Sequence, residues 1–330
     1  MLINAKKLLL IALILLLGLS GCANTARDIS EDTQETESEP TNSPAQNSDE
    51  QTTETNNTLD DPDKATNFAA ENDSLFHAYT LSEQEKALFG EENNEAEDGL
   101  VAILTLPGID QLGQSGPAGP TKGSHLESQE RQDFGTFVAR IRGASCHQEN
   151  EGVVTGFFTY FNNGADDNQN GIIDNSEIDF EILCAEPHVL YMSVWTDYQA
   201  NEQGETFHKV TRKVNLKTGK IWQTAPGDES SYDLSEMGEL DFTIPDFDTS
   251  QKFYTIGFTW QSKSVRYFII ENSQEYELWN MTDDTSVPQR ASYLMFNLWH
   301  NRWHWNGNGA ADYPSKEVAA AVDWFKYYLP

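Results

Sequence analysis

The stretch that decides the fold runs from residue 177 to residue 183 and reads Glu177-Ile178-Asp179-Phe180-Glu181-Ile182-Leu183. Acidic and apolar side chains alternate along it, and successive side chains of a β-strand point to opposite faces. A strand here would carry three carboxylates on one face and apolar side chains on the other. The apolar face predicts burial in a core, and the acidic face predicts a row of carboxylates outside that core.

Segments of similar character lie on both sides of this stretch. They are rich in β-branched and aromatic residues and are separated by Gly, Asn, Asp and Pro, which is typical of strands joined by turns. The clearest cover residues 99–106, 134–141, 153–161, 189–195, 206–216, 252–260, 264–271, 293–298 and 318–328. This spacing predicts one all-β domain, a β-sandwich or jelly roll, rather than βαβ units.

Two exceptions to the strand pattern are expected near the start of this domain. Ser82 and Glu85 have capping-box spacing before an apolar group, and Gly90 follows it. We therefore expect one short helix over residues 82–89. Residues 107–123 are rich in Gly and Pro and are expected to form a loop.

The first 75 residues differ in composition from the rest. Lys6 and Lys7 precede an apolar run that ends in Leu19-Ser20-Gly21-Cys22, which is similar to a bacterial lipobox. We expect a signal peptide over 1–21 and a lipid on Cys22 that anchors the protein to the outer membrane or the cell surface. An ordinary secretory signal with a coincidental cysteine is the alternative. Residues 22–75 are polar and acidic and predict a disordered tether, and residues 76–330 predict the folded domain.

The charge balance excludes one class of partner. The chain has 21 Lys and Arg against 53 Asp and Glu, a net charge of −32. Binding to a phosphate backbone depends on Lys and Arg that displace counterions, so we expect no nucleic-acid partner. The same balance disfavours adsorption to anionic lipid through charge. We expect a monomer.

Three carboxylates on one strand face suggest acid–base chemistry. Like charges this close do not all ionise freely, so at least one should have a raised pKa. A protonated acid beside an ionised carboxylate is what retaining glycoside hydrolysis requires. A solvated strand face, or a metal site without catalysis, would give the same pattern. Residues i and i+4 of a flat strand lie about 13 Å apart, whereas retaining carboxylates lie about 5–5.5 Å apart, so the strand or its side chains would have to bend.

The chain resembles family 16 of the glycoside hydrolases, whose E-[ILV]-D-x-E signature is similar to residues 177–181 (EIDFE). Further segments resemble the family's motifs in the family's order: 134–141 (FGTFVARI), 152–160 (GVVTGFFTY), 253–260 (FYTIGFTW), 294–299 (LMFNLW) and 323–327 (DWFKY). The resemblance covers about residues 120–330. It implies a concanavalin-like jelly roll and an endo-acting, retaining hydrolase of a β-linked polysaccharide such as a β-glucan.

The resemblance also implies roles for individual residues. Glu177 would be the nucleophile and Glu181 the general acid/base of a double displacement, with Asp179 tuning the pair. No cofactor is required for that chemistry. A non-catalytic carbohydrate-binding lipoprotein and a wall-polysaccharide transglycosylase are the competing functions.

Amide and aromatic side chains are the candidates for sugar binding, because sugar C–H faces stack on rings and polar groups bond the hydroxyls. The resemblance implies that Asn297 and Trp299 line the cleft near the cleavage point. Trp195 and Tyr160 lie on strands next to the acidic one and are further candidates. Trp303 has no counterpart in the family's motifs and is a candidate through its polar, aromatic surroundings, with core packing as the alternative.

A calcium-like motif leads into the acidic strand. Residues 166–177 fit D-x-[DN]-x-[DN]-G-x5-E, with Asp166, Asn168, Asn170 and Asp174 as oxygen ligands and Glu177 at the last position. Three interpretations stay open: a structural Ca²⁺ that leaves Glu177 free, a Ca²⁺ that Glu177 also binds in a lectin or inactive enzyme, and a simple Asn/Gly turn.

Two cysteines remain after Cys22. Cys146 precedes the strand at 153, and Cys184 ends the acidic strand. If these strands form a hairpin, both cysteines lie at the same end, and an exported protein meets oxidising conditions, so we expect a disulfide. Two separate small core residues are the alternative.

Overall fold

The computed structural model describes residues 61–70, 74–79, 87–112, 121–166, 169, 173–201, 204–224, 234–282, 286–303 and 309–330. Asp60–Pro330 forms one compact unit. Nearly all its described elements are strands, and α1 (Ile109–Leu112) is a single helical turn. In the described part of the chain, no helix has the length and hydrophobicity for a membrane crossing. The prediction of an all-β fold is confirmed.

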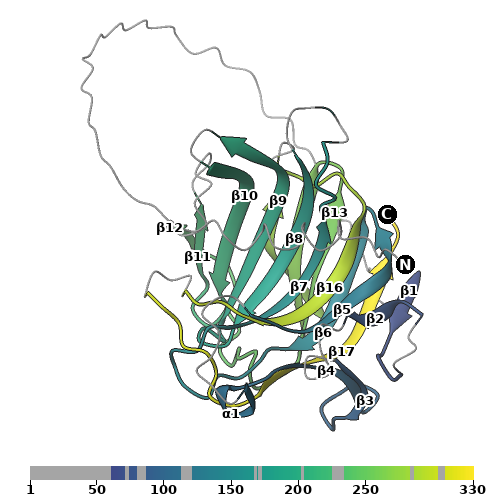
Figure 1. Ribbon diagram of the computed structural model, residues 1–330. Helices are drawn as coiled ribbons and strands as arrows, with labels where there is room; N and C mark the ends of the chain where they lie inside the picture. The colour runs from purple at the N-terminus through teal and green to yellow at the C-terminus, as the bar shows by residue number, and fades with distance from the viewer. Residues whose placement is uncertain are drawn as a thin grey trace, which may run out of the picture. The chain divides into compact units, whose positions relative to one another are not determined.

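The strands form two antiparallel sheets, which Figure 1 shows as two layers. The eight-stranded sheet has the order β15 (Gln274–Met281), β14 (Ser264–Glu271), β13 (Tyr254–Gln261), β6 (Gly135–Arg142), β17 (Val318–Tyr328), β4 (Leu100–Leu106) and β3 (Leu88–Glu92), with β1 (Lys64–Thr66) paired to β17. The nine-stranded sheet has the order β12 (Leu234–Glu239), β11 (Lys220–Thr224), β10 (Gly204–Asn215), β9 (Val189–Asn201), β8 (Ile173–Leu183), β7 (Val153–Phe161), β16 (Ser292–His300), β5 (Thr121–Gln132) and β2 (Phe76–Tyr79). Together they make the predicted jelly-roll sandwich.

The core lies between the two sheets, and β8 contributes one of its faces to it. Ile178, Phe180 and Ile182 are buried there. The Phe180 ring meets the ring of Tyr267 on β14 edge-on, with centroids 5.1 Å apart. The Tyr267 hydroxyl in turn donates to the Ser193 carbonyl oxygen on β9, at 2.6 Å. Because side chains alternate along a strand, the acidic face of β8 points away from this core, as the alternation predicted.

Packing reaches further toward the N-terminus than residue 76. β1 pairs with β17 and β2 pairs with β5, so the N-terminal segment joins both sheets. Phe68 is fully buried, with its ring centroid 5.3 Å from that of Phe76 and 5.9 Å from that of Phe296. The last part of the expected tether therefore belongs to the folded body, because Phe68 gains a hydrophobic environment there.

The expected helix over residues 82–89 is wrong in its described part. Ala87 is buried and Leu88–Glu92 is strand β3, which pairs with β4. Gly90 has a φ of 69°, and a Cβ at that position would lie 2.6 Å from the Ala69 carbonyl oxygen. The glycine thus permits a close backbone approach rather than ending a helix. Pairing with the edge of β4 overrides the local capping pattern, and residues 81–86 lie outside the described part.

Residues 107–123 also differ from the loop that was expected. They include α1 and the start of β5, while residues 113–120 lie outside the described part. β5 is rich in polar residues and gave no strand signal in the sequence. It forms nonetheless because it has partners on both sides, β16 and β2. A strand with partners on both sides can form without a strong sequence preference.

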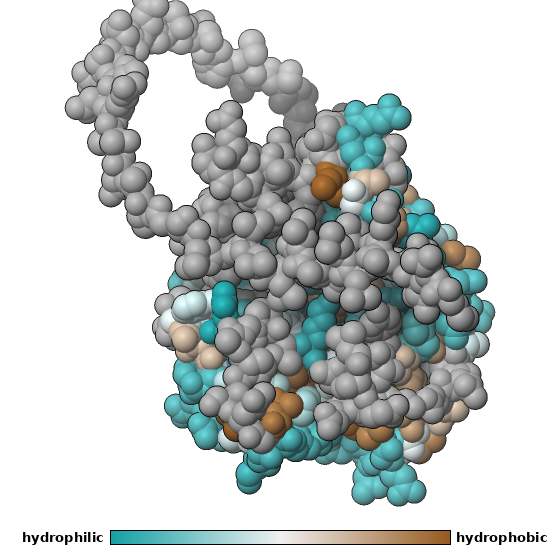
Figure 2. All heavy atoms as spheres, viewed as in Figure 1, coloured by the Kyte–Doolittle hydropathy of each residue, from teal (hydrophilic) through white to brown (hydrophobic). Residues whose placement is uncertain are grey.

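Large apolar side chains on the described surface are scattered. Figure 2 shows hydrophilic residues over most of the coloured surface, with isolated brown spheres. The exposed large apolar residues are Leu88, Ile173, Met237, Trp303 and Leu329. Such single residues are ordinary on a protein surface.

Candidate active site

The middle strand of the nine-stranded sheet carries Glu177, Asp179 and Glu181 side by side on its outer face; we call them the carboxylate row. The Asn175 side chain favours the ionised form of Glu177, and Glu177 shares a hydrogen bond with Asp179. Glu181 accepts a hydrogen bond from the indole of Trp299. The structure therefore brings together the three acids that the sequence singled out.

Burial raises the pKa of every member of the carboxylate row. It raises the pKa of Glu177 and of Glu181 to about 7. Burial also raises the pKa of Asp179 well above its usual value, and the negative charges of Glu177 and Glu181 raise it further. Near neutral pH the row therefore holds protonated and ionised carboxyl groups together, which is the condition for combining a general acid with a nucleophile.

A lysine that the sequence reading did not select faces the carboxylate row. Lys209 on β10 is opposite Trp195 on β9, and Trp195 is opposite Glu177 on β8. The Lys209 Nζ atom lies 4.0 Å from the centroid of the Trp195 ring. Burial lowers the pKa of Lys209, while the charges of Glu181, then Asp179, then Glu177 raise it. The carboxylate row thus has an ammonium group beside it.

Four of the five predicted sugar-binding residues lie around the carboxylate row. Tyr160 on β7 is opposite Glu177, and Trp195 is on its other side. Burial raises the pKa of Tyr160 to about 12, with a further contribution from the charge of Glu177. On β16, Trp299 bonds Glu181, and Asn297 lies two residues before it.

Trp303 is the predicted sugar-binding residue that does not join them. It is 49% exposed, lies beyond the end of β16 and forms an isolated bridge with Ala310. The Arg302 guanidinium lies 5.8 Å from its ring centroid. Its exposure excludes the alternative of a packed core aromatic.

Gly156 explains how Asn297 reaches the carboxylate row. Gly156 on β7 is opposite both Asn297 and Glu181. A Cβ atom on Gly156 would lie 2.5 Å from the Asn297 Oδ1 atom, so only glycine leaves room for the amide in this position. Among the described residues, the buried Oδ1 atom has no hydrogen-bond partner. This buried acceptor next to Glu181 thus lacks the partner that most buried polar atoms have.

Part of this domain is similar to a known protein family. Residues 81–221 match the model of the family described as glycosyl hydrolases family 16. The matched segment includes β8 and with it the carboxylate row. This match supports an enzyme that acts on glycosidic bonds in general. No curated protein matches the chain in a sequence comparison.

Solved structures that are similar to this chain include two enzymes of known name. The κ-carrageenase of Pseudoalteromonas carrageenovora, solved with an oligotetrasaccharide of κ-carrageenan, has 14% identity and a TM-score of 0.50, covering 80% of this chain and 92% of that one. The β-glucanase of Bacillus licheniformis has 18% identity and a TM-score of 0.45, covering 81% and 98%. At such identities the similarity to the carrageenase supports the fold alone.

A histidine on the far side of Asn297 extends the polar face around the carboxylate row. His125 on β5 is opposite Asn297 on β16. Burial lowers the pKa of His125 to about 4, and the charges of Lys122 and His77 lower it further. His125 is therefore neutral at pH 7. The sequence carried no signal for it, because β5 was not expected to be a strand.

The calcium-like loop before β8 is only partly described. Asn168 and Asn170 lie outside the described residues, and the backbone N–H of Asp174 donates to the Ala165 carbonyl oxygen at 2.9 Å. The Asp174 carboxylate is buried and forms an ion pair with Arg290. Calcium binding through Asp166, Asn168, Asn170 and Asp174 stays a prediction.

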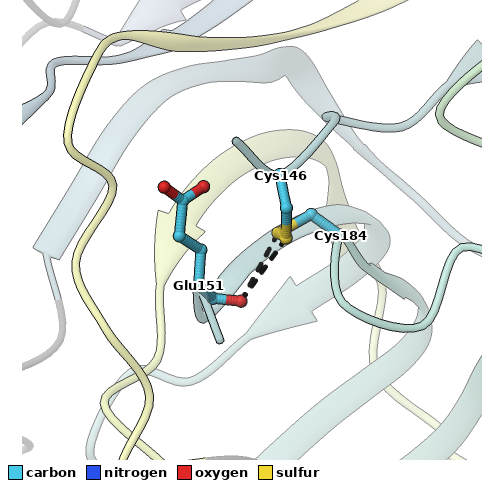
Figure 3. A group of neighbouring side chains, drawn as sticks. All are labelled: Cys146, Glu151 and Cys184. Carbon is cyan, nitrogen blue, oxygen red and sulfur yellow. Dashed lines mark hydrogen bonds between the residues drawn. A yellow bond between two sulfur atoms is a disulfide. The ribbon is translucent and has the colours of Figure 1, made fainter. Parts of the chain in front are cut away.

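Cys146 and Cys184 are joined by a disulfide at the end of β8, with Cα atoms 5.1 Å apart. Figure 3 shows both sulfur atoms beside the backbone of Glu151, whose carboxylate turns away from them. That carboxylate is buried and accepts a hydrogen bond from the His147 backbone N–H at 2.8 Å. The disulfide therefore ties the C-terminal end of the acidic strand to the segment that leads into β7.

Proposed function

We propose that the folded domain belongs to family 16 of the glycoside hydrolases and is an endo-acting, retaining hydrolase that cleaves a β-linked polysaccharide. The observation that carries this proposal is the carboxylate row on β8, with two glutamates whose pKa burial raises to about 7. Two such carboxyl groups meet the needs of double displacement, in which one is ionised and the other protonated. The retaining outcome and a β-glucan substrate rest on the E-x-D-x-E resemblance.

In the first step, the Glu177 carboxylate attacks the anomeric carbon and the bond to the leaving oxygen breaks. Glu181 donates its proton to that oxygen and becomes a carboxylate. In the second step, Glu181 takes a proton from water, the hydroxide attacks the anomeric carbon, and Glu177 leaves as a carboxylate. Asp179 is protonated because of its raised pKa, and its hydrogen bond to Glu177 holds the nucleophile in place.

The face around the row offers contacts for a sugar chain. The Asn297 Oδ1 atom can accept a sugar hydroxyl, and the Tyr160 hydroxyl stays protonated at every working pH. Trp195 and Trp299 flank the row at Glu177 and at Glu181. Aromatic rings with a few polar groups are typical of carbohydrate sites.

A panel of β-linked polysaccharides, scored for new reducing ends, tests the proposal. Wild-type protein should release short oligosaccharides from at least one polymer, and Glu177→Ala should release none. With an activated aryl glycoside, azide should restore Glu177→Ala as the inverted glycosyl azide and Glu181→Ala as the retained one. Binding without new reducing ends would contradict the proposal and indicate a carbohydrate-binding protein. Longer products in the presence of acceptor sugars would indicate a transglycosylase.

We also propose that Cys22 carries a lipid that holds the enzyme at the outer membrane or the cell surface, since residues 19–22 resemble a lipobox. The protein expressed in a bacterial host should incorporate a labelled fatty acid and sediment with membranes. Cys22→Ser should lose both properties and keep its hydrolase activity. Labelling that persists in this variant would contradict the proposal.

A further inference from the structure

Lys209 is a partly buried cation that the proposed mechanism does not use. Its Nζ atom lies 4.0 Å from the Trp195 ring centroid, so the ammonium rests on an aromatic face instead of extending into water. Its largest electrostatic partner is Glu181, although the residue two strands away in register is Glu177. Lys209 therefore lies on the same sheet face as the carboxylate row, and its charge acts on all three acids, most strongly on Glu181.

We propose that Lys209 is a positioning residue that acts as the counterion of Glu181 when Glu181 has given its proton to the leaving oxygen. This inference rests on the proposed roles of Glu177 and Glu181. The step itself is unchanged: the proton moves from the Glu181 carboxyl to the glycosidic oxygen, and the new carboxylate faces the Lys209 ammonium. A charge that forms near a fixed opposite charge, away from bulk water, is stabilised without any rearrangement of the site.

The balance of charge around Glu181 shows why it needs such a partner. Two other acids share its face of β8, and the remaining neighbours are mostly neutral. The groups that face Glu181 or Lys209 are Glu177 and Asp179 on β8, Tyr160 on β7, Tyr191 and Trp195 on β9, Thr211 and Lys213 on β10, Asn297 and Trp299 on β16, and His125 on β5. Tyr191 is bonded to Glu186, and His125 is neutral at pH 7.

The negative charges around Lys209 argue against binding of an anionic sugar substituent there. Three carboxylates act on this ammonium, and all of them would repel a sulfate or a second carboxylate. The positive charge is therefore directed to the row and not to the substrate.

Lys213 provides a matched control on the same strand and face. It lies four residues further along β10, opposite Tyr191, which is in turn opposite Glu181. Its Nζ atom lies 5.6 Å from the ring centroid of Tyr191 and 5.0 Å from that of Trp222. Like Lys209 it is a lysine over an aromatic ring. Unlike Lys209, it is not among the charges that act on Glu181.

The test compares full-length Lys209→Met, Lys209→Arg and Lys213→Met with wild type in pH profiles of kcat/KM. Without the cation, Glu181 holds its proton to higher pH, so the alkaline limb of Lys209→Met should move up by about one pH unit. On a polysaccharide its kcat should fall about tenfold, because a weaker acid donates its proton less readily. On an aryl glycoside with a good leaving group, which needs no acid, the loss should be small.

Lys209→Arg keeps the charge and should restore the wild-type alkaline limb, and Lys213→Met should leave it in place. An alkaline limb that does not move in Lys209→Met overturns the inference. Lower thermal stability of that variant would then indicate a structural role for Lys209, and a raised KM would indicate a contact with the substrate. If wild type releases no reducing ends, the proposed function itself fails. Suppose instead that wild type cleaves the polysaccharide while Glu181→Ala keeps activity only on substrates with a good leaving group. If the alkaline limb of Lys209→Met then does not move, the role of Lys209 is refuted and the proposed function stands.

Discussion

Two aspartates on the same strand have opposite surroundings. Asp174, near the start of β8, is 0% exposed and forms an ion pair with Arg290. Asp179, five residues later, is 6% exposed and lies between Glu177 and Glu181. The first carboxylate is balanced by a cation, and the second is crowded by two anions. A balanced carboxylate stabilises the fold, whereas a crowded one keeps a proton near neutral pH and so becomes available for chemistry.

The largest expected effect is a loss of activity, and it comes from the crowded acids. Glu177→Ala removes the proposed nucleophile and should lower kcat by a factor of about 10⁴ or more, because every turnover passes through the bond that Glu177 forms. Steady-state kinetics on the polysaccharide that wild type cleaves best would measure the loss. Far-UV circular dichroism should show an unchanged fold.

The matched variant for that experiment is Asp174→Asn. It alters an acid on the same strand and should change kcat less than tenfold, because the Asp174 carboxylate is engaged with Arg290. A loss as large as that of Glu177→Ala would mean that the balanced acid is also part of the chemistry. The distinction between balanced and crowded carboxylates would then be wrong.

The second effect concerns stability. Arg290→Met leaves the buried Asp174 carboxylate without its cation and should lower the free energy of unfolding by about 1–3 kcal/mol. Urea unfolding followed by tryptophan fluorescence would measure this at pH 7. Arg302→Met is the control, since the Arg302 guanidinium lies by the exposed ring of Trp303. Equal losses in the two variants would show that the ion pair contributes nothing beyond an ordinary surface arginine.

The crowded part of β8 could be predicted from the sequence because its pattern is local. Alternation over seven residues fixes which side chains share a face, and it placed Glu177, Asp179 and Glu181 together without reference to another strand. The apolar residues between them likewise predicted the core face. The hairpin of β7 and β8, and with it the disulfide of Cys146 and Cys184, needed only the order of neighbouring strands.

The partners of that row could not be predicted, because they depend on register. Lys209 reaches the row only because β10 pairs with β9 so that it is opposite Trp195, and a shift of one residue would place Val210 there instead. The Arg290 partner of Asp174 is 116 residues away in the chain. β5 gave no strand signal at all, so His125 was missed with it.

The third effect tests whether activity needs the space that Gly156 leaves for the Asn297 amide beside the crowded acids. Gly156→Ala would place a methyl group 2.5 Å from the Asn297 Oδ1 atom and push the amide away from its place beside Glu181. We expect kcat/KM to fall about tenfold, since one hydrogen bond to the substrate is worth roughly 1–1.5 kcal/mol.

Asn297→Ala and the double variant complete a cycle for this contact. If Gly156→Ala acts by displacing the amide, the double variant should lose no more than Asn297→Ala alone. Losses that multiply would mean that the methyl group disturbs the site in another way, for example through Phe158, whose Cδ1 atom would lie 3.3 Å from it.

The smallest expected effect is a gain in stability, whereas Arg290→Met should lose stability. The folded-state pKa of Glu181 is raised from 4.5 to about 7, so the unfolded chain ionises first as pH rises. The native state therefore loses stability between about pH 4.5 and pH 7, and it carries the full penalty above pH 7. Glu181→Gln removes the crowded charge and should raise the free energy of unfolding on the order of 1 kcal/mol at pH 8, with almost no gain at pH 4.5. Urea unfolding at both pH values measures the difference, with Asp174→Asn as the variant expected to lose stability instead. A Glu181→Gln protein less stable than wild type at pH 8 would mean that Lys209 already compensates the row in full, and that the crowded carboxylates cost the fold nothing.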